Sequence, residues 1–355
     1  MVSLLYEIER ISKMALIYKK HFFLKLTILI FTLFLFCSCE KGTELEFEKI
    51  YSYNGMLYSE SEAKNVTGII GNVEIGYRLT IPAGYSNKKV TIPAYYNGLP
   101  VFNVEILSKN IEKINVDEDS FYYSSQSDIL YNKDKTSLIF CPPQKTGVIK
   151  IPSSVKTIES YAFYGSRATK IVFGKNLKKI MPYAFYDTAF TAFEFPASVA
   201  EISEYAFVGN EALISVTVDK NNLVYCTKDG VLFDNNKTLI LYPNAKEQRD
   251  YIVPEDTVKI SASAFYGKMY LSLVYLNKGL EEIGDKNFCS VEGISIVLPN
   301  SLKKIGESFC LNSAAVSLYC NFDENSFINQ YLPTGEEITT HRGMWESIPT
   351  PPQSK

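Results

Sequence analysis

The sequence predicts a repeat solenoid, in which turns of 21 to 23 residues stack and together form a parallel β-sheet face. The first observation is a tripeptide, Tyr-Ala-Phe, that begins at Tyr161, Tyr183 and Tyr205, at a spacing of 22 residues. The second is a longer pattern of apolar positions that ends in this tripeptide and aligns six times along the chain. The third is composition: 46% of the 355 residues are hydrophobic, which is enough apolar material for an extended folded body and argues against wholesale disorder.

Six segments carry the repeat, and each is aligned here on a phenylalanine at its end. They are residues 149–163, 171–185, 193–207, 252–265, 274–288 and 296–309. Self-similarity at a fixed period indicates supersecondary units that bury their apolar faces against neighbouring copies.

The first half of each segment predicts a short strand. In the first segment Ile149 and Ile151 alternate with Lys150, as expected for a strand with one buried face. Pro152 then ends the strand, because proline cannot donate to a continuing ladder of hydrogen bonds.

The second half of each segment is expected to turn back under the strand and bury it. Val155 and Ile158 lie three residues apart, and a small alanine followed by phenylalanine completes the core face. A Gly or Asp follows the phenylalanine, which is typical of a turn. We therefore interpret the tripeptide as scaffolding, with three stacked core pairs: Ala162-Phe163, Ala184-Phe185 and Ala206-Phe207.

The consensus I-x-I-P-x-x-V-x-x-I-x-x-x-A-F resembles the BspA-type leucine-rich repeats of bacterial surface proteins, over residues from about 69 to 322. The resemblance implies a right-handed coil that is rich in β-structure, with short helical or irregular turns. It also implies a non-catalytic binding module at the cell surface. Five positions depart from the consensus and are expected to loosen individual turns: Gly174, Thr257, Asn277, Asn287 and Ser308.

A longer module also repeats, and it predicts two β-hairpin inserts. Residues 115–145 parallel residues 217–246, about 102 residues further on. Each module holds two apolar strands around a polar turn, at 129–131 and 138–140 in the first and at 231–233 and 239–241 in the second. Upstream, residues 78–104 are rich in β-forming residues around an Asn97-Gly98 turn, and they are expected to cap the first coil.

The N-terminal region predicts export. Basic residues precede an uncharged run at 26–38, which has the length of a signal-peptide core and is too short to span a membrane. The run ends in "LFCSC" (residues 35–39), which resembles the lipobox of bacterial lipoproteins and makes Cys39 the predicted lipidation site. A plain signal peptide cut nearby is the alternative. Met14 gives a cleaner signal start than Met1 and is a candidate initiator.

The predicted organisation has four parts. They are a signal peptide at 1–38, a lipidated tether at 39–60, a leucine-rich-repeat solenoid with an N-terminal β cap at 61–330, and a disordered C-terminal tail at 331–355.

Composition excludes most catalytic and cofactor chemistry. The formal net charge of −3 gives no field that recruits nucleic acid. The two histidines are His21, in the signal, and His341, in the predicted tail, so a histidine-based triad or a Cys/His zinc site is not expected. No P-loop or G-x-G-x-x-G occurs, and no cofactor is predicted.

The remaining chemical candidates have simpler structural explanations. Glu281-Glu282 and Asp117 with Asp119 are acidic pairs that fit a solvated surface better than acid–base catalysis or a calcium site. Cys289 and Cys310 each follow a repeat phenylalanine, which places them at equivalent sites of adjacent coils. They are either a disulfide or two buried small side chains, and the second interpretation is favoured.

The candidate binding face is the row of outward residues between the two core positions of each strand. The row consists of Lys150, Val172, Glu194, Ile252, Tyr275 and Val297. Four of the six are apolar or aromatic, and a contiguous exposed apolar patch marks an interaction site. The alternative is that β-branched residues simply suit a strand, or that a neighbouring segment covers them.

The sequence therefore predicts an exported lipoprotein, anchored to the outer membrane by its lipid and exposed at the cell surface. It would bind a host or bacterial surface protein or a glycan without catalysis and without contact to nucleic acid. One alternative is a structural or assembly component of an outer-membrane complex. Another is a glycan-active enzyme with carboxylates brought together by folding.

Overall fold

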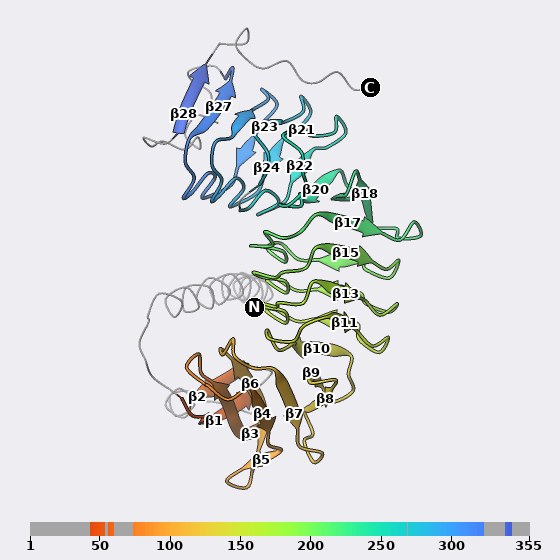
Figure 1. Ribbon diagram of the computed structural model, residues 1–355, viewed down its shortest axis with the longest axis vertical. Helices are drawn as coiled ribbons and strands as arrows, with labels where there is room; N and C mark the ends of the chain where they lie inside the picture. The colour runs from red at the N-terminus through yellow and green to blue at the C-terminus, as the bar shows by residue number, and fades with distance from the viewer. Residues whose placement is uncertain (1–42, 54–55, 60–73, 268, 323–337, 343–355) are drawn as a thin grey trace, which may run out of the picture. The chain divides into compact units, whose positions relative to one another are not determined.

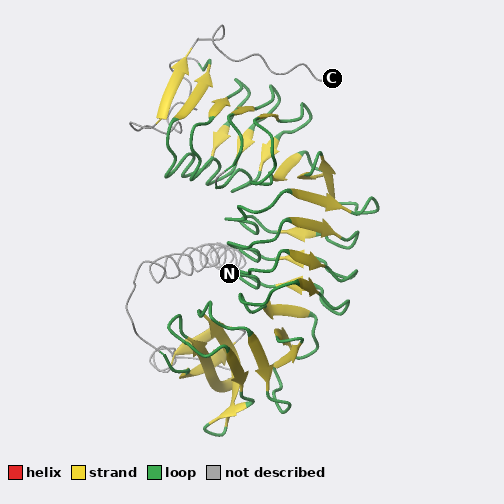
Figure 2. Ribbon diagram, viewed as in Figure 1, coloured by secondary structure: helices red, strands yellow, loops and turns green. Residues whose placement is uncertain are grey.

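The computed structural model describes residues 43–53, 56–59, 74–267, 269–322 and 338–342. Apart from Thr43, all of these residues belong to one compact unit, Glu44–Lys355. The predicted signal peptide, Met14 and Cys39 lie outside the described residues. The described residues form strands and turns and contain no helix, so their connections are turns and not the short helices that the prediction allowed (Figure 2). Accordingly, no helix long and apolar enough to cross a membrane occurs in this part of the chain.

The cap is a five-stranded sheet beside a strand pair. The sheet order is β2 (Met56–Ser59), β1 (Glu46–Tyr53), β3 (Glu74–Ile81), β6 (Leu99–Ile106) and β5 (Tyr95–Tyr96); the pair is β4 (Lys89–Ile92) with β7 (Lys113–Val116). The predicted Asn97-Gly98 turn joins β5 to β6, with φ of 47° and 78° at its two residues, as a tight hairpin requires.

The prediction of a tether at residues 39–60 is corrected, because β1 and β2 of this sheet occupy most of that segment. β1 pairs antiparallel with both β2 and β3, and Ile50 within it is fully buried. The charged residues of the segment hide its alternation of apolar and polar positions in the sequence, which is why it was interpreted as a solvated linker.

Two repeat blocks follow, and each begins with an antiparallel three-stranded meander (Figure 1). The meanders are β8 (Tyr123–Gln126), β9 (Ile129–Asn132) and β10 (Ser137–Phe140), and β18 (Tyr225–Lys228), β19 (Val231–Asp234) and β20 (Thr238–Leu241). The β9–β10 and β19–β20 pairs confirm the two predicted hairpin inserts. β8 and β18 each add one strand that the prediction lacked.

Parallel strands one turn apart form the predicted sheet face. In the first block they are β11 (Val148–Lys150), β13 (Lys170–Val172), β15 (Ala192–Phe195) and β17 (Ser215–Val218). In the second block they are β21 (Asp250–Ile252), β23 (Leu273–Tyr275), β25 (Ser295–Val297), β27 (Val316–Cys320) and β28 (Ile338–Arg342). In the first block β11 pairs in parallel with β13, and β15 with β17, as two separate pairs. In the second block all five strands pair in parallel in one sheet, as a solenoid of stacked turns requires.

Each turn also contributes a second, two-residue strand to another parallel row. These strands are β12 (Thr157–Ile158), β14 (Lys179–Ile180), β16 (Glu201–Ile202), β22 (Lys259–Ile260), β24 (Glu282–Ile283) and β26 (Lys304–Ile305). They extend the two meanders through β10 and β20. Most of their isoleucines are buried, which confirms that this half of the repeat closes the core.

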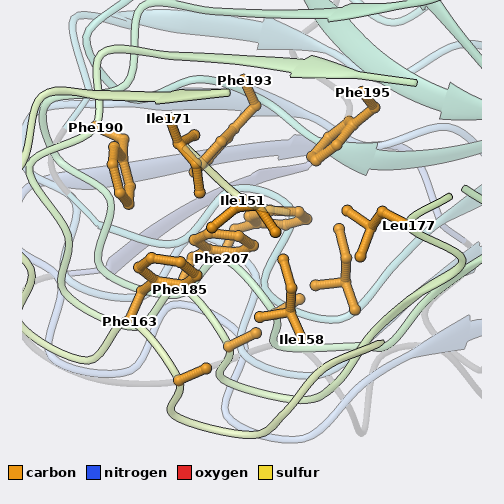
Figure 3. Close-up of a cluster of buried hydrophobic side chains, with 14 of the residues drawn as sticks. Ile151, Ile158, Phe163, Ile171, Leu177, Phe185, Phe190, Phe193, Phe195 and Phe207 are labelled. Carbon is orange, nitrogen blue, oxygen red and sulfur yellow. The ribbon is translucent and has the colours of Figure 1, made fainter. Parts of the chain in front are cut away.

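The phenylalanines of the three Ala-Phe pairs stack in the core as predicted (Figure 3). The rings of Phe163 and Phe185 lie 5.1 Å apart at 9°, and those of Phe185 and Phe207 lie 5.6 Å apart at 8°. The Phe163 amide donates to the Ala184 carbonyl of the next turn at 2.8 Å, so backbone and side chain repeat together. Ala162 and Ala184 are fully buried, which leaves room only for a small side chain.

Two departures from the consensus tighten their turns, contrary to expectation. A Cβ on Gly174 would lie 2.5 Å from the Pro152 carbonyl oxygen of the preceding turn, so that position has no room for the usual proline. Asn277 Nδ2 donates to the carbonyl oxygens of Pro254 and Thr257, both at 2.9 Å. The asparagine therefore ties its turn to the one before it.

The last repeat has a different register from the one that the sequence alignment gave. The pairing of Ile283 with Ile305 and the bridge between Glu292 and Ala314 fix an offset of 22 residues. At that offset Cys310 takes the place of Phe288, and Phe309 takes the alanine position. The ring of Phe309 accordingly meets Phe288 edge-on at 76°, whereas the earlier pairs are stacked.

The C-terminal boundary is also corrected. β28 pairs in parallel with β27 over five residues, so the sheet face continues past residue 330 into the segment predicted to be a disordered tail.

Candidate binding surface

The strand register brings the predicted row of outward residues together in two groups. Lys150 pairs with Val172 in the first block. In the second block Ile252 pairs with Tyr275, and Tyr275 pairs with Val297. Since directly opposite side chains in a sheet stand about 5 Å apart on the same face, each group forms a continuous row.

The first-block members of the row are exposed and mix charge with apolar surface. Lys150 and Glu194 are exposed, and Val172 between them exposes 45% of its surface. The next outward residue along the row, Thr217, pairs with Glu194 and is also exposed.

The second-block members are less accessible than predicted. Ile252 exposes 42% of its surface, but Tyr275 is only half-exposed and Val297 retains 6%. Val297 stands between the large side chains of Tyr275 and Tyr319, its neighbours on the adjacent strands. Val297 is therefore corrected from a contact residue to a buried one. The Tyr275 hydroxyl is enclosed and has no hydrogen-bond partner within the described part of the chain.

The same row continues onto the last strand, where His341 pairs with Tyr319. The two rings are stacked at 4.6 Å and 14°. His341 was assigned to an aperiodic tail, but it occupies a regular outward position of the sheet. Its ring neighbour is aromatic, so this contact gives it no nucleophile to activate.

The acidic pair Glu281-Glu282 faces lysines and not another carboxylate. Glu281 lies 2.8 Å from Lys303, and Glu282 lies 2.7 Å from Lys304 and 3.5 Å from Lys259. The hydrogen bond from Lys304 lowers the pKa of Glu282, which keeps it ionised. A general acid needs the opposite shift.

The second acidic cluster closes a turn. Asp117 Oδ1 accepts the Asp119 amide at 3.0 Å, and the Asp117 carbonyl accepts the Ser120 amide at 3.0 Å. Across the residues that the structure describes, no group of three or more His, Cys, Asp or Glu side chains is placed to hold a metal ion.

The described part of the chain holds five cysteines, all of them free: Cys141, Cys226, Cys289, Cys310 and Cys320. Cys289 and Cys310 are not at equivalent sites, because Cys310 takes the place of Phe288 in the repeat. Both are buried, and burial raises the pKa of each thiol, which suppresses the reactive thiolate. They behave as small core side chains.

The tyrosines of the repeated tripeptide form a surface that the sequence interpretation missed. Tyr161, Tyr183 and Tyr205 have φ of 61°, 59° and 64°, and their half-buried rings stack at 5.1 and 5.6 Å. Tyr164 and Tyr186, three residues further along their turns, stack beside them at 5.4 Å. The sequence signal for this surface is a tyrosine that precedes the core alanine in three successive repeats.

These phenols stay neutral in physiological conditions. Burial raises the pKa of Tyr183 to about 12, and burial together with the nearby Asp285 carboxylate raises that of Tyr205. The Tyr205 hydroxyl donates to Asp285 Oδ2 at 3.2 Å, across 80 residues of sequence. The hydroxyls therefore act as hydrogen-bonding groups and not as bases.

Strands stacked one turn apart, a phenylalanine ladder and a row of variable outward residues define a leucine-rich-repeat solenoid. A model of the family described as "BspA type Leucine rich repeat region (6 copies)" matches residues 139–244 and 241–333, more than half of the 355 residues. The chain belongs to this family.

Solved structures of bacterial leucine-rich-repeat proteins are similar to this chain. The pneumococcal vaccine antigen PcpA is 21% identical, with 74% of this chain and 65% of PcpA aligned and a TM-score of 0.45. A leucine-rich repeat protein from Eubacterium ventriosum is 20% identical over 70% of each chain, with a TM-score of 0.48. A leucine rich cell surface protein from Faecalibacterium prausnitzii is 16% identical over 69% of this chain and 84% of its own, with a TM-score of 0.42. The chain thus spans just under two thirds of PcpA. No curated protein matches the sequence.

Proposed function

We propose that this protein is a non-catalytic binding protein of the cell surface, which recognises a protein or a glycan through the exposed part of its sheet face. The observation that supports this best is the set of exposed outward residues, Lys150, Val172 and Glu194 in the first block and Ile252 in the second. Charged side chains beside partly exposed apolar ones are typical of a recognition surface, in which apolar anchors supply affinity and charges supply selectivity.

Binding without catalysis is also supported by the state of the reactive groups. Glu281 and Glu282 are paired with lysines, and Cys289 and Cys310 are buried in the core. Affinity on such a surface comes from many contacts spread over successive strands and not from one reactive side chain.

The sheet-face proposal predicts the effect of two charge substitutions. V172D and I252D place a carboxylate on exposed apolar positions of the row, so each should weaken capture of the partner at least tenfold while leaving the unfolding midpoint nearly unchanged. The measurement is biolayer interferometry against immobilised collagen, fibronectin, laminin and mucin glycans. The matched control is I214D, because Ile214 is somewhat more exposed than either residue, at 53%, but lies outside the strands of the row. Equal binding by wild type, V172D and I252D would remove the sheet face from the proposal.

Export and anchoring belong to the same proposal and rest on the residues around Cys39. Cells grown with a radiolabelled fatty acid should label the wild-type protein, whereas C39A should remain unlabelled. Protease treatment of intact cells should then degrade the labelled protein if it faces outward. A labelled C39A variant, or a protein that is protected until the cells are broken, would contradict the anchor or the outward orientation respectively.

A further inference from the structure

An open depression of about 670 Å³ lies on the turn edge of the solenoid, outside the strands of the sheet face. It is lined by the turns that follow the repeat phenylalanines, around residues 166, 188 and 211 in the first block and 267 in the second. Lys109 and Gln144 complete it. Its volume falls in the range of sites for small ligands, which is about 300–1,000 Å³.

The walls of the depression are fixed by the backbone. Gly165, Asp187, Gly209 and Gly267 all have left-handed φ, between 56° and 96°, so the chain turns in the same way in each repeat. The Gly165 amide donates to the Tyr186 carbonyl at 3.0 Å, and the Asp187 amide donates to the Val208 carbonyl at 3.0 Å. A ligand would meet a surface that is already ordered, which lowers the entropy cost of binding.

Aromatic and charged side chains are held in place along these walls. Lys109 Nζ lies 3.4 Å from Asp187 Oδ2 and 4.2 Å from the centre of the Tyr164 ring. Tyr186 lines the depression, and its ring stacks on that of Tyr164 with the ring centres 5.4 Å apart. Burial is the main cause of the raised pKa of Tyr186, and Tyr266 from the second block lies close enough to raise it further.

The chemistry of the lining distinguishes between classes of ligand. Lys109 and Arg167 carry positive charge while Asp187 and Glu211 carry negative charge, so the formal charges cancel and no anion is favoured. Among the described lining residues the only aliphatic side chains are alanines, so the apolar pocket that anchors a protein partner is missing. The lining therefore consists mainly of hydroxyl, amide and charged groups, which include both hydrogen-bond donors and acceptors, beside phenol rings.

We propose that this depression is a second binding site, independent of the sheet face, and that it takes a neutral oligosaccharide. Sugar hydroxyls both donate and accept hydrogen bonds, which fits a lining that holds the Lys109–Asp187 ion pair and two phenols. The apolar faces of sugar rings pack against aromatic side chains such as Tyr186 and Tyr266, which lie on opposite repeat blocks. The site therefore holds a sugar chain between two blocks of the solenoid.

The test measures oligosaccharide binding by the full chain and by variants that keep the aromatic rings. The probes are cellohexaose, maltohexaose and α-mannohexaose in isothermal titration calorimetry. We expect at least one to bind, and Y186F and Y266F each to weaken that binding about two- to tenfold, because each variant removes one hydroxyl and leaves ring stacking intact. The double variant should lose more than either single one.

Two controls and one further variant make the test decisive. Y95F removes an exposed hydroxyl from the cap and should leave binding unchanged. V172D with I252D should also leave it unchanged, which separates this site from the proposed sheet face. D187N, which keeps a residue that tolerates left-handed backbone, should weaken binding by loosening Lys109.

The proposal is overturned if none of the neutral hexasaccharides binds at millimolar concentration, or if Y186F and Y266F bind as wild type does. Binding confined to an anionic probe such as a heparin hexasaccharide would also overturn it. Loss of binding in the V172D and I252D variants but not in Y186F would assign the sugar to the sheet face instead.

Discussion

Tyr161, Tyr183 and Tyr205 have a left-handed backbone conformation, which residues other than glycine rarely adopt. The left-handed region costs an L-residue roughly 1–2 kcal/mol, and three successive turns accept this cost at the same position. Ring stacking at 5.1 and 5.6 Å and partial burial offset it. A substitution at this position therefore changes two opposing terms at once.

The opposing terms predict an unusual order of stability at Tyr183. Y183A loses the ring and keeps the strain, whereas Y183G loses the ring and relieves the strain. Both should be less stable than wild type, and Y183A should be the less stable of the two by about 1 kcal/mol. Urea unfolding curves measure the difference.

Tyr164 provides the matched control for this comparison, because it is a stacked tyrosine of the same turn edge that does not have positive φ. There Y164G should be less stable than Y164A by about 0.5–1 kcal/mol, the ordinary order for glycine against alanine. The same order at both positions would contradict the role of backbone strain.

At the scale of single elements, the two-residue strands owe part of their alignment to charge. Glu282 on β24 lies between Lys259 on β22 and Lys304 on β26, at 3.5 and 2.7 Å. The three side chains form an ionic row across three strands, above the buried isoleucines Ile260, Ile283 and Ile305. The row is partly solvated, so its contribution is limited.

This ionic row predicts a pH-dependent effect of E282Q. The pKa of Glu282 is lowered below its ordinary value of 4.5 by the hydrogen bond from Lys304, and the nearby charge of Lys259 adds to it. A carboxyl with a lowered pKa stabilises the fold above pH 4.5, and that contribution disappears as the pH falls through the folded-state pKa. E282Q should therefore cost under about 1 kcal/mol at pH 7 and nothing at pH 2. Thermal unfolding at the two pH values checks this, and an equal loss at both would contradict it.

Elements with a clear sequence period were predictable, and very short ones were not. The alternation around Ile149 and Ile171 identified the sheet strands, since two buried positions flank each outward one. A strand of two residues such as Thr157–Ile158 is too short to show a period of 2. The register of the last repeat was missed because matching Phe309 to Phe288 ignores the backbone pairing, which fixes 22 residues per turn.

The candidate surfaces were predictable only in part, for a related reason. The outward direction of Lys150, Val172 and Ile252 follows from alternation within one strand. The burial of Val297 depends on tyrosines in the strands before and after it, 22 residues away on each side. The depression depends on turns of different blocks that line it together, such as those of Tyr186 and Tyr266. Neither kind of contact is encoded in a local pattern.

At the scale of the whole described body, buried phenols are spread from the cap to both repeat blocks. Burial raises the pKa of Tyr123 in the first meander to about 12, and it raises that of Tyr251 in the second block as well. A phenol with a raised pKa stabilises the fold below its ordinary pKa of 10.0, and this contribution is lost as the pH rises through the folded-state value. Alkaline solution should therefore unfold the molecule.

The alkaline transition can be followed by the absorbance of tyrosinate at 295 nm. We expect two phases: one near pH 10 from accessible tyrosines, and a cooperative one near pH 12 that coincides with loss of the β-sheet circular dichroism signal. In concentrated guanidinium chloride a single phase near pH 10 should remain. A single phase near pH 10 in the native protein would show that the phenols are accessible to hydroxide.

The offset of 22 or 23 residues between stacked phenylalanines also gives the chain a nearly fixed step. Each complete turn advances the stack by one strand spacing, about 4.8 Å, while the ring ladder and the turn edge look the same to their neighbours. Removing residues 171–192 would bring Phe163 onto Phe207 by way of one intact turn and shorten the stack by that single step. The length of such a stack can therefore be adjusted in whole steps by duplication or loss of turns, while the ladder of repeat phenylalanines is kept.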